Sequence, residues 1–485
     1  MAPNIKNIQG DIWPRLPKKY ETFLFFEITD VEQFKHELGV FLKHLTTAET
    51  AHRLRGKLYE AKWCGLWSQL VETICTNISF SAAGLEKLGK TDLGDSIFKR
   101  GMYHDMVHDG LDRDAEWLGE FKGSRGQIDG VFTLAASSED TVNNWMTDGI
   151  NPRFSKTVRW LFTQSGAVLN KYDIEHFGWK DGVSQPLIKV LDPENTEKLS
   201  PGNIHPGYII VGEEGDTQSH PDWAKDGSFM VFRRLKQLVP EFTNWAVKNI
   251  RPQAELPNEG GLKLGVISTL SSRLVGRWPN GISLEEKPAP TDVLTDKALP
   301  EDDGQLSAED RKLLASNNFD FQDIQHQNKC PFASHIRKVR PRAELMRPDG
   351  TLDDTHAMIR RGISFGPVTS NEEKRNGVTT HDRGLLFVSY QSNLHNGFRQ
   401  VQNEWANKTS FPPGKTRNGG PEPGLDPIIG QWAENDDESN FINMPRFDDP
   451  SVTEKWKLER CVIAEGGEYF FAPSISGIKD IIGVQ

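Results

Sequence analysis

Short strand-like segments recur far apart along this chain, with helical patterns between them. The first segment, Tyr20–Ile28, is rich in Phe and Thr, and the helix expected after it begins beyond Asp30, whose carboxylate can cap it. Similar segments predict strands at residues 76–80, 130–136, 228–232, 384–390 and 468–472. Strands this short and this widely separated favour an α+β fold, with an antiparallel sheet and helices on one face, over a parallel βαβ array.

The strand and helix pattern is repeated in two halves of the chain. A polar, turn-rich stretch, Gly212–Pro221, lies between the halves and predicts the domain junction. We therefore expect an N-terminal domain over residues 1–220 and a C-terminal domain over residues 221–485. Residues 283–310 are rich in Pro, Asp and Glu, which predicts a surface insertion in the second half.

Composition excludes several classes of function. The formal net charge of −11 argues against nucleic acid as the main partner. No apolar run approaches the roughly 18 residues of a membrane-spanning helix, so we expect a soluble protein with no membrane partner. The segment Met1–Lys6 lacks the apolar core of a signal peptide, which leaves two options: an intracellular protein, or one whose leader has been removed.

His335 stands out among the histidines because of the charge around it. Four cations occur in the seven residues that follow it, in the segment 336–342. An imidazole beside concentrated positive charge suits an anionic cofactor whose metal takes an axial nitrogen ligand, such as haem with its propionates. An ordinary basic turn is the alternative. Cys330, followed by Pro331, is a competing thiolate ligand for haem.

Two further stretches carry groups suited to chemistry. Asp181 is bracketed by glycines in Gly178–Gly182, which indicates a tight turn where backbone can approach a ligand closely, although an ordinary Asx turn would look the same. Arg360 and Arg361 follow an apolar lead and precede Gly362. A surface arginine pair at a strand end is the alternative there.

Taken together, these stretches resemble the dye-decolorizing peroxidases, in particular the longer fungal type. A lone GxxDG motif would be weak support, but several motifs occur here in family order over nearly the whole chain. They are Asn7-Ile8-Gln9-Gly10-Asp11, Gly178-Trp179-Lys180-Asp181-Gly182, Val275-Gly276-Arg277-Trp278, His335-Ile336-Arg337-Lys338, Ile359-Arg360-Arg361-Gly362 and Gly424-Leu425-Asp426-Pro427-Ile428-Ile429-Gly430-Gln431.

The resemblance implies two ferredoxin-like α+β domains, each with a four-stranded antiparallel sheet and peripheral helices, as in a dimeric α+β barrel. It also implies one haem b per chain, held mainly by the C-terminal half. His335 would be the proximal iron ligand and Asp426 its acidic partner, which displaces the Cys330 ligand. Asp181, in the N-terminal domain, and Arg360 would face the peroxide, with Arg361 as the alternative to Arg360.

The resemblance further implies that Leu385 and Phe387 line the haem pocket, together with Arg337. Trp405 resembles a surface position that passes electrons from bulky substrates, but its helical stripe with Phe398 and Val401 also fits a core residue. Some fungal members have a tyrosine where this chain has Phe365, which puts a relay there in doubt. Possible substitutes without a supporting motif are Tyr390, Trp278 and Trp432.

The function implied is a haem peroxidase that reduces hydrogen peroxide and oxidises bulky aromatic dyes and phenolic compounds. An Asp proton acceptor, with an ordinary pKa of ~3.9 against ~6.5 for His, predicts an acidic optimum. The alternatives are a non-catalytic haem-binding protein on the same fold and a chlorite-decomposing enzyme. Family resemblance implies an extracellular protein, and a monomer or dimer. The acidic run Glu434–Glu438 could bind Mn²⁺ or be a solvated loop.

Overall fold

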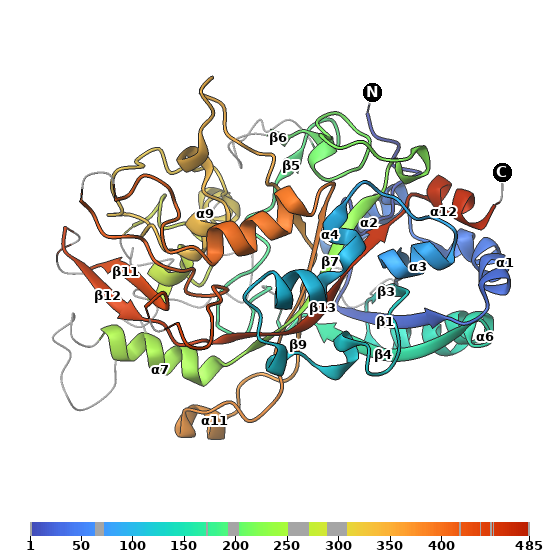
Figure 1. Cartoon of the computed structure of the whole chain (residues 1–485), viewed down its shortest axis with the longest axis horizontal. Helices are drawn as coiled ribbons and strands as arrows, with labels where there is room; N and C mark the ends of the chain where they lie inside the picture. The colour runs from blue at the N-terminus through green and yellow to red at the C-terminus, as the bar shows by residue number, and fades with distance from the viewer. Residues whose placement is uncertain are drawn as a thin grey trace.

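The computed structural model describes residues 2–63, 72–170, 173–192, 203–250, 271–288, 308–416, 419–436, 438–446, 449 and 451–483. Its main feature is a nine-stranded sheet in the order β4-β1-β3-β2-β13-β7-β10-β8, with β9 paired to β10. Neighbouring strands run antiparallel throughout. Helices surround the sheet, so the α+β class expected from the sequence is confirmed (Figure 1).

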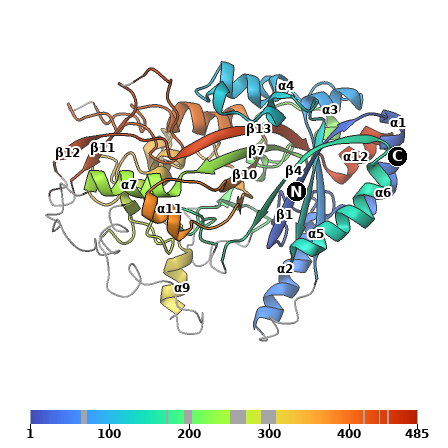
Figure 2. The same cartoon turned by 90° about the horizontal axis from the view of Figure 1, so that it is seen from below.

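The first four strands form the N-terminal half of the sheet. Two helical segments, one between β1 and β2 and one between β3 and β4, give the β-α-β-β-α-β order of a ferredoxin-like unit. Figure 2 shows α5 and α6 beside these strands. The elements are β1 (Tyr20–Ile28), α1 (Val31–Phe41), α2 (Ala48–Trp63), β2 (Ile74–Phe80), α3 (Ala82–Lys87), α4 (Ser96–Arg100), β3 (Gly130–Ala136), α5 (Glu139–Trp145), α6 (Asn151–Phe154) and β4 (Val158–Ala167).

The C-terminal half repeats this strand order, with β13 beside β7, β7 beside β10, and β10 beside β8 and β9. The repetition agrees with the similar halves read from the sequence. The elements are β7 (Ser228–Gln237), α7 (Val239–Ile250), α9 (Ala308–Ala315), α10 (His335–Val339), β8 (Ile359–Arg360), β9 (Ile363–Phe365), α11 (Asn371–Asn376), β10 (Gly384–Gln391), the π-helix η11 (His395–Ala406), β11 (Phe441–Pro445), β12 (Thr453–Lys457), β13 (Val462–Ala472) and α12 (Ile475–Ile482).

The two halves meet at two equivalent seams. At one seam, β2 pairs with β13 through Phe80 and Phe471. At the other, β4 lies against β9, and a Cβ at Gly166 would come within 2.6 Å of Ile363 and of the Ser364 carbonyl. Glycine is therefore required where the two backbones approach. The two half-sheets thus face each other as an α+β barrel.

An aromatic core fills the space between the half-sheets. Phe23 and Phe25 of β1 contact Phe232 of β7, with ring centroids 4.9 and 5.1 Å apart. Edge-to-face rings of this kind add to the free energy gained from apolar burial. Because side chains alternate along a strand, the residues flanking Phe232 point to the outer face of the C-terminal half-sheet, where the cavity described below lies.

Two features bear on the predicted limits of the domains and of the surface insertion. Helix α12, at the end of the chain, packs beside α1 of the N-terminal half in both views (Figures 1 and 2). Ser283 and Leu284 are buried, so the predicted surface insertion does not begin at residue 283. Residues 289–307, the main part of that insertion, lie outside the described residues. The boundary near residue 220 stays a prediction.

Candidate functional site

A cavity lies on the outer face of the C-terminal half-sheet. Strands β7 and β10 form one wall, α10 and η11 form another, and the loop that contains residues 175–186 reaches over from the N-terminal half. Leu385 and Phe387 of β10 point into the cavity together with Phe398 and Val401 of η11. The lining is therefore largely apolar, and the polar groups described next lie at defined points on it.

Asp181 and Arg360 form an ion pair in this cavity. A guanidinium Nη1–H of Arg360 donates to Asp181 Oδ1 at 2.7 Å, and the Arg360 and Asp181 side chains are 27% and 35% exposed, respectively. Gly178 and Gly182 flank the aspartate with φ of 102° and 78°, values that a side chain rarely tolerates. Burial would raise the pKa of Asp181, but the adjacent Arg360 outweighs it and the pKa is lowered.

Gln185 holds the backbone of Arg360 in place. Its side-chain oxygen accepts the Arg360 N–H at 3.0 Å, and its amide donates to the Arg360 carbonyl at 3.2 Å. Gln185 therefore ties the loop of Asp181 to strand β8. The sequence analysis assigns Gln185 no role, because an amide side chain near an aspartate has no local signature.

Arg361 points away from the cavity. Its guanidinium is buried and donates to the carbonyls of Asp11 at 2.8 Å and Ile12 at 3.0 Å. Successive residues of an extended segment face opposite sides, so only one arginine of the pair can line the cavity. The geometry favours Arg360 over the Arg361 alternative.

His335 lines the same cavity, at the first position of α10. Its Nδ1 lies 2.8 Å from Asp426 Oδ2, and the other Asp426 oxygen accepts the N–H groups of Ile428 and Ile429. Burial would raise the pKa of Asp426, but His335 and the two N–H groups lower it. Because an ionised carboxylate only accepts, the proton lies on His335 Nδ1, and Nε2 is the nitrogen that would serve as a metal ligand.

The charge around the cavity fits an anionic group. Arg277 and Arg342 are buried in the lining, and neither forms an ion pair with a carboxylate among the described residues. Burial lowers the pKa of Arg277 to about 10 and lowers the pKa of Arg342 well below its usual range. Both guanidinium groups donate to backbone carbonyls and to Asn317 instead, which leaves them without a paired carboxylate in the described part of the chain, so an apolar ligand with acidic substituents, such as haem, fits this cavity and its donor set.

Cys330 does not line the cavity. Its thiol is fully buried in a separate cluster with Trp278 and Ile336, and burial raises its pKa to about 11. A thiol in such a place stays protonated and is a poor ligand. The structure thus agrees with the preference for His335.

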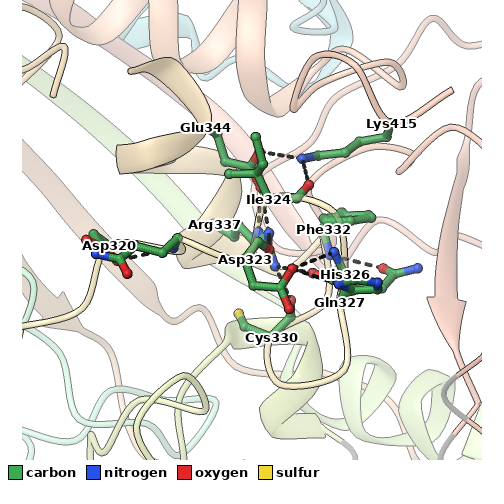
Figure 3. Close-up of polar contacts among 11 residues, drawn as sticks. Asp320, Asp323, Ile324, His326, Gln327, Cys330, Phe332, Arg337, Glu344 and Lys415 are labelled. Carbon is green, nitrogen blue, oxygen red and sulfur yellow. Dashed lines mark hydrogen bonds and ion pairs between the residues drawn. The ribbon is translucent and has the colours of Figure 1, made fainter. Parts of the chain in front are cut away.

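Arg337, expected in the haem pocket, is not among the residues that line the cavity. Its guanidinium is buried on the other side of α10, where it donates to Glu344 and to the carbonyls of Cys330 and Asp323 (Figure 3). Lys415 pairs with the same glutamate. This expectation was wrong because the segment 336–342 directs its cations to different sides, and only Arg340 and Arg342 line the cavity.

Trp405 was expected at the surface, but it is only 3% exposed. Its ring stacks on Phe411 at 5.2 Å and meets the His356 ring at 5.0 Å. His356 itself lines the cavity. The core reading of its helical stripe is therefore correct, and Trp405 is not a surface residue. The three possible substitutes, Tyr390, Trp278 and Trp432, are buried as well, and so is Phe365.

Two further properties concern metal sites and membranes. Within the part of the chain that the structure describes, no three His, Cys, Asp or Glu side chains come together as a metal site. Asp437 of the acidic run Glu434–Glu438 lies outside the described residues. Among the described helices, none is both long enough and apolar enough to cross a bilayer.

Comparison with known proteins agrees with the α+β barrel described above. Residues 7–168 match the DyP dimeric alpha+beta barrel domain, and residues 303–411 match the C-terminal domain of Dyp-type peroxidases. The chain is 33% identical to dye-decolorizing peroxidase msp1 of Mycetinis scorodonius, over 99% of this chain and 88% of that protein. It is 34% identical to a dye-decolorizing peroxidase of Auricularia auricula-judae, over 98% of this chain and 86% of that protein.

Solved structures give the same result. An ancestral D-type dye-decolorizing peroxidase is 37% identical, with a TM-score of 0.84 that covers 99% of this chain and 100% of that one. A dye-decolorizing peroxidase solved in complex with 2,6-dimethoxyphenol is 34% identical, with a TM-score of 0.79 over 99% of both chains. The fold and site thus define a peroxidase of α+β barrel type. The chain belongs to the dye-decolorizing peroxidase family, whose members depend on haem.

Proposed function

We propose that this enzyme binds haem b in the described cavity, reduces hydrogen peroxide there and oxidises aromatic dyes and phenolic compounds. One observation carries the proposal: a single cavity contains both the Asp181–Arg360 pair and His335 with Asp426 behind it. Haem, when bound, supplies the two-electron reduction of peroxide and the one-electron oxidation of reducing substrates. The remaining chemistry is done by side chains.

Asp181 moves the proton. Its low pKa keeps it ionised, so its carboxylate can accept a proton from one oxygen of hydrogen peroxide. Returning that proton to the other oxygen lets the departing oxygen leave as water. Arg360, hydrogen-bonded to Asp181, offers fixed positive charge where negative charge develops on the departing oxygen.

His335 would hold the haem iron through its imidazole, while Asp426 keeps the proton on Nδ1. A carboxylate behind the imidazole makes it a stronger electron donor, which favours the higher oxidation states that peroxide chemistry needs. Leu385 and Phe387 close the peroxide side with apolar surface and exclude bulk water. Buried Arg277 and Arg342 would face the propionates.

The reducing substrates are aromatic and phenolic compounds, with the dimethoxyphenol complex of a relative as support. Family resemblance also favours an extracellular location. Trp405 is buried and residue 365 is a buried phenylalanine, so neither side chain is an exposed contact point for bulky dyes.

The test is a visible spectrum of the haem-loaded enzyme before and after one equivalent of peroxide. The parent should change its spectrum rapidly, whereas Asp181→Asn should react far more slowly. Asp173→Asn is the matched control, since Asp173 lies in the same loop and contributes only its carbonyl to Asp181. A parent that binds haem but shows no spectral change with peroxide would support the haem-handling alternative instead.

A further inference from the structure

Lys338 carries an ammonium group in the interior of the protein, one helical turn after His335 on α10. The side chain has no measurable exposure. Its Nζ donates to three backbone carbonyls, those of Lys408, Phe411 and Gly424, each at 2.7 Å. Three short bonds from one nitrogen use all the donors that an ammonium has. No carboxylate forms an ion pair with it among the described residues.

The three carbonyls surround the segment that carries Asp426. Gly424 lies two residues before Asp426, and its N–H donates to Thr409 at 2.8 Å. The Asp426 N–H donates to Ala406 at 2.9 Å. The residues around 406–411 and 424–426 are thereby bound into one unit, and Lys338 is the link from this unit to the helix that carries His335.

The position of Gly424 leaves little freedom in this unit. Its φ is 93°, and a Cβ there would lie 2.3 Å from the Phe441 carbonyl. Because the backbone at Gly424 has little freedom, the hydrogen bond from Lys338 to its carbonyl also restrains the residues next to it. Burial lowers the pKa of Lys338 to about 7, although the negative charge of Asp426 acts to raise it. Three carbonyl acceptors need three N–H donors, which only the charged form of the amine has.

We propose that Lys338 is a positioning residue that holds Asp426 against His335 and so sets how strongly the histidine donates electrons to iron. This inference rests on the proposed function, in which His335 is the iron ligand. Arg337, the preceding residue on α10, is equally buried but binds Glu344 and the loop around Cys330 on the other side. Lys338 and Arg337 are therefore two buried cations of the same helix, of which only Lys338 contacts the segment that carries Asp426.

The experiment compares the Fe(III)/Fe(II) midpoint potential of the haem-loaded parent with those of Lys338→Met, Asp426→Asn and Arg337→Met. Lys338→Met should shift the potential to more positive values, in the direction of Asp426→Asn, because the histidine becomes a weaker donor. Arg337→Met should shift it less. Lys338→Arg, which keeps the charge and donors, should restore part of the parent value.

A parent-like potential in Lys338→Met, with a clear shift in Asp426→Asn, would overturn the inference. If Lys338→Met does not fold, Lys338→Gln keeps two N–H donors and is measured in the same way, with an intermediate shift expected and an unchanged potential overturning the inference. His335→Gln separates the two proposals. If it leaves the spectrum of the bound haem unchanged, the proposed function fails, whereas loss of the histidine-ligated spectrum combined with an unchanged Lys338→Met potential refutes only the role of Lys338.

Discussion

Asp181 in the cavity lining and Asp426 behind His335 are each paired with a basic side chain, but their surroundings differ. Asp426 is fully buried, with one oxygen on His335 and the other on two backbone N–H groups. Asp181 is 35% exposed and contacts the guanidinium end of a long side chain, Arg360. Both have a lowered pKa. Asp426 is therefore a fixed hydrogen-bond acceptor, whereas Asp181 is open to the cavity and can exchange a proton with a ligand.

This difference predicts that the distal carboxylate matters most for turnover. Asp181→Asn cannot accept a proton, and loss of a general acid–base typically costs ~10²–10⁴-fold, so kcat/KM for peroxide should fall by that order. The measurement is steady-state oxidation of a small phenol at saturating reductant. Asp173→Asn should keep the parent rate. A loss of less than about tenfold in Asp181→Asn would remove the proton-transfer role.

The proximal carboxylate should have a smaller effect. Asp426→Asn keeps a hydrogen-bond acceptor beside His335 but loses the charge, and such outer-sphere changes typically cost ~10–100-fold. The same assay should show this drop together with weaker haem retention on dilution. If Asp426→Asn were the more damaging of the two substitutions, the contrast between a fixed and an exchanging carboxylate would be wrong.

The strands and the fold class could be read from the sequence because they depend on local patterns. The predicted strand Tyr20–Ile28 is β1, and the Asp30 cap accepts the N–H of Gln33. Strand β4, Val158–Ala167, was not predicted, since its alternation includes exposed polar residues. The seam between β4 and β9 depends on Gly166 and residues about 200 positions away, which no local pattern reports.

The site could be predicted only where motifs specify it. Asp181, Arg360, His335 and Asp426 do come together in or beside one cavity. The directions of the cations after His335 could not be predicted, because a five-residue helix turns by about 100° per residue and its first residue is not evident from sequence. Trp405 shows the same limit, since a stripe at helical spacing does not say which side faces solvent.

The pH profile should sharpen the comparison further. Because Arg360 lowers the pKa of Asp181, the carboxylate stays ionised, and active, at pH values where an ordinary Asp would begin to protonate. Activity should therefore persist in acid and fall only below the lowered pKa. Arg360→Gln should move the acid limb of kcat/KM to higher pH, while Arg361→Gln should leave the limb in place. Equal shifts in both variants would show that the ion pair is not the cause.

The smallest expected effect concerns Gln185, which connects the loop of Asp181 to the Arg360 backbone in strand β8. Gln185→Leu removes both hydrogen bonds to the Arg360 backbone without touching a charge. A net loss of about 1.4 kcal/mol, or about tenfold in kcat/KM, is expected if these bonds only position the guanidinium. Gln185→Glu keeps the acceptor for the Arg360 N–H and should recover part of the rate. Because Asp426 is held by its own backbone contacts, Gln185→Leu should leave the haem potential unchanged, and a shift in that potential would show that the two carboxylates are not independently held.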